Sequence, residues 1–178
     1  DGLQALVTHD AELGDHVCSR DHQLNDFELQ VDEQVTKIIA RRQPAGPDLR
    51  FLVAAIRTGT DLERVGDEAG KLGRFAIEFG HGQALEPRLV RAMGRLGEEV
   101  RRILQAALEA FARNDSSAAA DLMDDIDAVA QAHEGVMREF MTYMMEDPRT
   151  IQRVLHALWC ARALERIADH ARNLCESV

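Results

Sequence analysis

The sequence predicts an all-α protein built as a tandem of two three-helix bundles, in which the first helix of the first repeat is largely missing. Only 4 prolines and 12 glycines occur in 178 residues, and the helix formers Ala, Leu, Glu and Arg are abundant. Four clusters of turn residues separate long segments whose apolar residues recur at helical spacing. A motif of the form Leu-Glu-Arg-Val/Ile-small-Asp also occurs twice, which indicates an internal duplication.

The turn clusters place the helices in chain order. The residues before His9 are expected to be the remnant of the first helix. The five full helices are then expected over about residues 11–42, 48–79, 87–113, 117–146 and 149–178. Pro87 suits a first helical position, and Asp115 or Ser116 suits an N-cap. Because the connections are short, neighbouring long helices should run antiparallel, as in up-and-down bundles.

The two halves of the chain align with a slowly drifting offset. Pro44 and Pro148, which close equivalent hairpins, lie 104 positions apart, and Glu63 and Glu165 lie 102 positions apart. Such drift is what a duplication with altered loop lengths leaves behind. We therefore expect a first repeat over residues 1–80, consisting of a helical hairpin with a remnant helix. The second repeat, a three-helix bundle, is expected over residues 87–178.

Charge and cysteine content restrict the function. The net charge of −10 argues against a nucleic-acid backbone as a partner and suits a metal cation or a basic protein surface. No apolar run approaches the roughly 20 residues of a membrane-spanning helix, so any membrane association should go through partners. The three cysteines fit neither a zinc site nor a disulfide framework, which indicates a reduced, cytoplasmic protein.

Each copy of the repeated motif places two acids, one helical turn apart, in line with apolar residues. On the last helix an apolar stripe starts at Ile151 and Leu155 and continues through Glu165 and Asp169. Glu63 and Asp67 interrupt the equivalent stripe of the second helix in the same way. An unpaired buried carboxylate costs several kcal/mol, so each pair needs compensation. Internal salt bridges with nearby arginines or a partly open groove would provide it, and so would a cation bound by both acids.

The hairpin geometry predicts which residues oppose each acidic pair. Reflection about the first turn places Asp21, Asn25 and Glu28 level with Glu63 and Asp67, which is a set of oxygen ligands. Glycines near this pair either allow close helix packing or leave space for a metal. Reflection about the second turn places mostly apolar residues opposite Glu165 and Asp169.

The second pair therefore has fewer candidate ligands nearby. They are Asp127 and His133. A lone histidine on an apolar stripe is more often a hydrogen-bonded core residue than a ligand.

Four stretches resemble the PhoU family of regulators of bacterial phosphate transport. They are ARRQPAGPDLR, TDLERVGDEA, YMMEDPRTI and ALERIADHARNLCE, in the family's order. The resemblance implies two tandem three-helix bundles, a homodimer and a cytoplasmic location. It implies a non-enzymatic negative regulator that binds the ATPase subunit of the phosphate importer and the sensor histidine kinase of the phosphate two-component system. Some members carry multinuclear iron or zinc clusters on paired Glu/Asp-x-x-x-Asp motifs.

The family's ligand pattern transfers unevenly onto this chain. Both Glu-x-x-x-Asp pairs match in full, and Asp21/Asn25 matches the first-helix partner with an amide in place of the second acid. In the second repeat the equivalent partner positions hold Ile126 and Ala130. Only Asp127 or His133 could substitute there, so the first site is the stronger candidate. All-oxygen ligands also suit Mg or Mn, and a histidine admits Zn.

Two alternatives remain beside a metal-binding regulator. One is a helical adaptor whose acids form salt bridges and bind no metal. The other is a carboxylate-bridged di-metal enzyme, which is disfavoured because the chain lacks the Glu-x-x-His motif of that chemistry. Arg41 and Arg42 are candidates for a partner contact, although arginines at a helix C-terminus are equally explained by the helix dipole.

Overall fold

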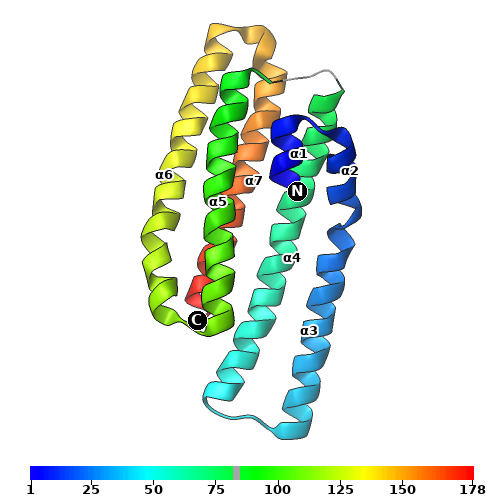
Figure 1. The fold of residues 1–178 in the computed structure, drawn as a ribbon, viewed down its shortest axis with the longest axis vertical. Helices are drawn as coiled ribbons and strands as arrows, with labels where there is room; N and C mark the ends of the chain where they lie inside the picture. The colour runs from blue at the N-terminus through cyan, green and yellow to red at the C-terminus, as the bar shows by residue number, and fades with distance from the viewer. Residues whose placement is uncertain (82–84) are drawn as a thin grey trace.

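The chain folds into α-helices joined by short turns (Figure 1). The structure is a computed structural model that describes residues 1–81 and 85–178. In chain order the elements are α1 (Gly2–Thr8), α2 (Ala11–Ser19), α3 (Asp21–Arg42), α4 (Pro47–Gly80), α5 (Pro87–Arg113), α6 (Ser116–Glu146), the 3₁₀ turn η1 (Pro148–Thr150) and α7 (Ile151–Glu176). No strand occurs in the part of the chain described, so the predicted all-α class is confirmed.

Local signals in the sequence set the helix ends. Asp115 caps α6, with its carboxylate accepting a hydrogen bond from the backbone N–H of Ala118 at 3.0 Å. Asp10 caps α2 in the same way, accepting from Leu13 N at 2.9 Å. Pro87 begins α5, where its missing N–H costs nothing. The predicted start of α5 and the N-cap of α6 are therefore confirmed.

The segment predicted as a single helix over residues 11–42 is two helices that meet at Arg20. The hydroxyl of Ser19 donates to the carbonyl of His16 at 2.9 Å. The backbone N–H of Arg20 bonds to Val17 O, three residues back, at 3.2 Å. Both bonds replace the i→i−4 pattern and end α2 with a tightened turn. No proline or glycine marks this break, so hydrophobic periodicity alone missed it.

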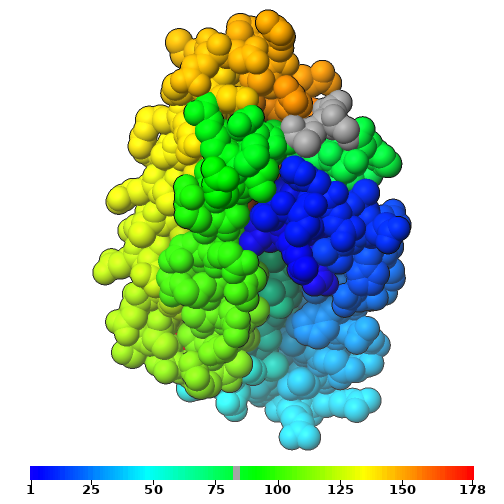
Figure 2. All heavy atoms as spheres, turned by 45° about the horizontal axis from the view of Figure 1, so that its top comes forward, coloured from blue at the N-terminus to red at the C-terminus, as the bar shows by residue number. Residues whose placement is uncertain are grey.

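The helices form two groups that meet at α4 and α7. α5, α6 and α7 pack on one another as a three-helix bundle, and α4 packs along α7. α3 runs antiparallel to α4, and α2 covers the other half of α4 (Figure 1). α1 lies between α2 and α5, as Figure 2 also shows, and it packs on α4. The short α1 thus occupies, in the first repeat, the position that α5 holds in the second.

The hydrophobic core lies mainly in the second repeat. Its buried side chains come chiefly from α5, α6 and α7, and Leu6, Leu72 and Phe79 extend it into the first repeat. On α6 one apolar stripe is buried, formed by Leu122, Ile126, Val129, Val136 and Phe140. In contrast, α3 buries only Val35.

On α7 the predicted packing face is wrong. Ile151 and Leu155 are 43% and 44% exposed, and the buried face instead carries Val154, Ala157 and Ala161. The helices α4, α5 and α6 all pack against this face, and small residues such as Ala157 and Ala161 allow them to approach closely. The larger apolar side chains of its first turns therefore face outward.

Close backbone contact between α2 and α4 depends on glycine. A Cβ atom at Gly73 would lie 2.8 Å from the carbonyl oxygen of Gly14, and the reciprocal Cβ would lie 2.6 Å from Gly73 O. At Gly66 the nearest atom is instead the Leu24 Cδ1 tip, at 2.5 Å, and a side-chain tip can move. Gly66 and Gly73 thus serve helix packing, which was one of the two readings of the glycines beside Glu63.

We expect Gly73→Ala to lower the free energy of unfolding by about 1–3 kcal/mol, because neither backbone can retreat from the new methyl group. Gly135→Ala on α6 is the matched control. No atom lies within 4 Å of a Cβ built there, so alanine should stabilise the helix by about 0.5–1 kcal/mol. Urea denaturation followed by circular dichroism measures both. Equal effects of the two changes would contradict the close α2–α4 contact.

Candidate functional site

The first acidic pair lies on α4, facing α3. Glu63 is half-buried and Asp67 is exposed. Asp21 lies over the α4 backbone, since a Cβ at Gly66 would be 3.5 Å from its Oδ1. Further along α3, Glu28 Oε1 accepts a hydrogen bond from the Thr60 hydroxyl at 2.8 Å. The structure therefore brings Asp21 and Glu28 to the level of Glu63, as the hairpin geometry predicted.

These acids repel one another. The pKa of Glu63 is raised above its usual value, first by partial desolvation and then by the negative charges of Asp67, Glu28 and Asp21. Within residues 1–81 and 85–178, no ion pair compensates Asp21, Glu63 or Asp67. The side chain of Asn25 is exposed on α3. The cluster is thus rich in oxygen ligands, and the positive charge of Arg64 offsets the repulsion at Glu63 only in part.

The second acidic pair has basic partners. Glu165 is ion-paired with Arg162 and lies 3.5 Å from Nδ1 of His133. His133 is buried at 6% exposure. The paired glutamate is only half-buried, and Asp169 is exposed.

The neighbouring acid of the second repeat is also neutralised. Asp127 Oδ1 lies 2.5 Å from Arg172 Nη2, and this contact raises the pKa of Arg172. Salt bridges therefore account for Glu165 and Asp127, whereas Asp169 makes no ion pair within the described residues. A bound cation is the better-supported explanation for the first acidic pair.

The sequence placed both acidic pairs on packing faces, either buried or in a partly open groove, and the structure shows partial exposure. Both pairs lie at the margins of their interfaces, because the closely packed faces of α4 and α7 consist of other residues. On α4 these include Thr58, Gly59, Asp61, Gly66 and Glu68. Partial exposure lowers the cost of the acids and leaves them accessible to an ion from solvent.

The side chains of the two acidic pairs can be tested for their fit to the metal that the family resemblance implies. Among the described residues, no three His, Cys, Asp or Glu side chains converge closely enough to hold one metal ion as placed. The first cluster nevertheless consists of carboxylates and an amide on two facing helices, which suits a hard divalent cation after side-chain rotation. In the second repeat, Arg162 already pairs with Glu165 and Arg172 with Asp127, so these two acids fit a metal poorly.

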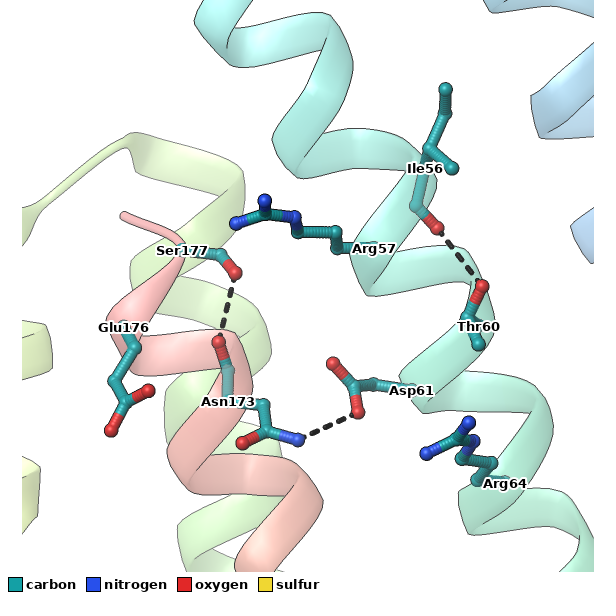
Figure 3. Close-up of a pocket in the computed structure, with 8 residues that line it drawn as sticks. All are labelled: Ile56, Arg57, Thr60, Asp61, Arg64, Asn173, Glu176 and Ser177. Atoms are coloured by element: carbon teal, nitrogen blue, oxygen red, sulfur yellow. Dashed lines mark hydrogen bonds between the residues drawn. The ribbon is translucent and has the colours of Figure 1, made fainter.

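Sequence reasoning missed the two acids that are most buried. Asp61, 8% exposed, lies 2.8 Å from His170 Nδ1 and accepts a hydrogen bond from Asn173 Nδ2 at 2.9 Å. In Figure 3, Asp61 on α4 and Asn173 on α7 point toward one another beside a cavity of about 420 Å³. Arg57 and Arg64 also line this cavity.

A second polar link lies two turns along α4. Glu68, 5% exposed, accepts hydrogen bonds from Lys71 Nζ at 2.8 Å and Arg166 Nη1 at 3.1 Å. The two copies of the repeated motif thus pack against each other and join the repeats. The signal available in the sequence was the seven-residue spacing of Asp61 and Glu68, which places both on one face of α4.

Arg41 and Arg42 are exposed in the last turn of α3. This position suits the helix dipole, and their predicted role in a partner contact stays a prediction.

The PhoU domain family model matches residues 1–76 and 93–178. Over 178 residues the chain is 42% identical to the phosphate-specific transport system accessory protein PhoU homolog of Pseudomonas aeruginosa, spanning 100% of the chain and 73% of that relative. The chain belongs to the PhoU family. It is also 41% identical to the phosphate-specific transport system accessory protein PhoU of Escherichia coli, with the same coverage of both sequences.

Solved PhoU structures share the fold. The crystal structure of PhoU from Pseudomonas aeruginosa matches with a TM-score of 0.91 at 42% identity, over 99% of this chain and 84% of that one. The phosphate transport system regulatory protein PhoU from Streptococcus pneumoniae matches with a TM-score of 0.86 at 26% identity, over 99% and 82%. These names describe accessory and regulatory proteins of phosphate transport. They do not describe enzymes.

Both acidic pairs lie within the ranges that the PhoU model matches. Among the helices described here, none combines the length and apolar character that crossing a membrane requires.

Proposed function

We propose that the protein is a negative regulator of phosphate uptake and of the phosphate two-component signalling system. It would act by binding the ATPase subunit of the phosphate importer and the sensor histidine kinase, as a homodimer on the cytoplasmic side of the membrane. The observation that carries this proposal is the identity of 41–42% over the whole chain to phosphate-specific transport system accessory proteins. The helical surfaces offer protein contact area, which suits an adaptor held at the membrane by its partners.

Binding to purified partners tests this role. The full chain should retain the importer ATPase and the cytoplasmic part of the histidine kinase in a pull-down at physiological salt. Its expression in cells that lack their own regulator should lower transcription of phosphate-starvation genes when phosphate is plentiful. If neither partner is retained and transcription is unchanged, the proposal is wrong.

We infer that the first acidic cluster binds a divalent metal, with iron and zinc as the first candidates. Glu63 and Asp67 would supply carboxylates from α4, and Asp21, Asn25 and Glu28 would complete the set from α3. The repulsion that, after partial desolvation, raises the pKa of Glu63 supports this assignment, because a cation would relieve it. The metal would neutralise charge and fix α3 against α4.

The Glu63→Gln change tests the metal site. Without metal, the raised pKa means that Glu63 contributes stability below its unfolded-state pKa of about 4.5, and this contribution is lost as pH rises through the folded value. The variant should therefore be more stable than the parent at neutral pH when metal-free. Added metal should raise the melting temperature of the parent more than that of the variant.

Glu165→Gln is the matched control, because Arg162 already neutralises that acid. Elemental analysis of untagged protein gives an independent measure of metal content. Equal metal content in the parent and in Glu63→Gln would remove the first cluster as a site. If only Glu165→Gln lost metal, the metal site would lie in the second repeat instead.

A further inference from the structure

An exposed apolar stripe runs along the first turns of α7. Ile151, Leu155 and Trp159 are spaced four residues apart, so they lie on one face of the helix. Trp159 is 62% exposed and is the single tryptophan of the chain. Tryptophan is the side chain most enriched at the energetic centres of protein interfaces. We call this stripe, together with the pocket beside it, the tryptophan surface.

The pocket lies between α7 and α4 and has a volume of about 260 Å³. The apolar wall of the pocket is formed by Phe75, Trp159 and Ala163. The polar lining consists of Lys71, Arg74, Arg162 and Arg166 with the acids Glu68 and Glu78. An aromatic wall rimmed by several guanidinium groups can accept an apolar side chain flanked by carboxylates.

The acids of the pocket are already engaged inside the protein. Glu68 is buried and bonded to both Lys71 and Arg166. Glu78 Oε2 lies 2.9 Å from His156 Nδ1. Within the described residues Arg74 makes no ion pair, and it is exposed.

The second exposed arginine of the rim, Arg162, shares its charge with Glu165 on its own helix. The rim therefore presents positive charge on a chain whose net charge is −10. Local charge opposite to that of the whole molecule selects an acidic partner and orients it on approach.

We propose that the tryptophan surface docks an acidic amphipathic segment of a partner protein. An apolar side chain of the segment fills the pocket beside Trp159, and its carboxylates bind Arg74 and Arg162. Ile151 and Leu155 extend the contact along about two further helical turns. The proposal rests on the proposed function only in requiring a protein partner. Its location differs from the acidic cluster between α3 and α4.

Fluorine NMR of protein labelled with 5-fluorotryptophan tests this docking, because the single tryptophan yields one reporter in the surface itself. The probe is a tryptophan-free synthetic peptide of roughly 18 residues, about five helical turns, with Leu on one face and Glu on the other. The resonance should shift and saturate with this peptide, and the affinity should fall as salt is raised. A peptide with Lys in place of Glu should leave the resonance unchanged.

Charge reversal locates the contact. Arg74→Glu and Arg162→Glu should each weaken peptide binding by about tenfold or more. Arg95→Glu, an exposed arginine on α5, is the matched control and should change the affinity less than about twofold. Trp159→Ala should also weaken binding, measured by fluorescence of a labelled peptide. Because all of these side chains are exposed, the fold should survive each change.

Several outcomes would overturn the proposal. No shift at about 1 mM acidic peptide excludes the docking, and so does equal binding of the Lys peptide. A shift that depends on the concentration of the protein alone identifies a second copy as the occupant. Retention of the importer ATPase and the kinase without a resonance shift keeps the proposed function and rejects this surface. Peptide binding without retention of either partner rejects the proposed function and keeps the surface.

Discussion

Phe79→Ala is expected to lower the free energy of unfolding by about 3–5 kcal/mol. The Phe79 side chain is 1% exposed at the end of α4. Its ring meets the ring of His9 edge-on, with centroids 5.8 Å apart, and lies 6.5 Å from the ring of His156. His9 lies in the turn between α1 and α2, and His156 lies on α7, so truncation opens a cavity where three elements meet.

Phe27→Ala is the matched control, because Phe27 is 47% exposed on α3. Its removal should change the free energy of unfolding by no more than about 1 kcal/mol. Urea denaturation monitored by circular dichroism gives both values. A loss below about 1 kcal/mol for Phe79→Ala would mean that the end of α4 is not packed as described.

Asp61→Ala should lower the free energy of unfolding by about 2–4 kcal/mol, which is the second large effect. The change leaves His170 and Asn173 without their partner at the contact between α4 and α7. It also removes a polar link that helps hold the two repeats in register. The unfolding transition should become broader if the repeats then separate before each unfolds.

Asp26→Ala on α3 provides the reference, since Asp26 is exposed. The expected effect there is within about 0.5 kcal/mol. Hydrogen exchange adds a local readout, because amides of α4 and α7 around the contact should lose protection in Asp61→Ala. If neither the amide protection nor the denaturation midpoint changed in Asp61→Ala, the buried acid would have no structural role.

The candidate site was partly predictable from the sequence. The approach of Asp21 and Glu28 to Glu63 followed from hairpin geometry, because a short turn fixes the level at which two antiparallel helices face each other. The buried roles of Asp61 and Glu68 did not follow. Their partners lie about a hundred residues away on α7, and local periodicity carries no information on which helix faces meet.

The face of α7 shows why periodicity failed there. The helical spacing of Ile151 and Leu155 predicts a buried stripe, yet both side chains are exposed. Three neighbouring helices pack against the opposite face of α7, where Val154, Ala157 and Ala161 are buried. A single-sequence pattern reports that a helix is amphipathic, whereas the number and closeness of its neighbours decide which face is buried.

The sequence by itself determined the helical class and the family, because propensity, turn residues and motif spacing are local properties. It also determined that Glu63 meets the acids Asp21 and Glu28 of α3. Only the tertiary structure decided that Arg162 and Arg172 neutralise acids of the second repeat. It alone placed Asp61 at the junction of the repeats and left Trp159 exposed, because long-range packing settles which side chains share one environment.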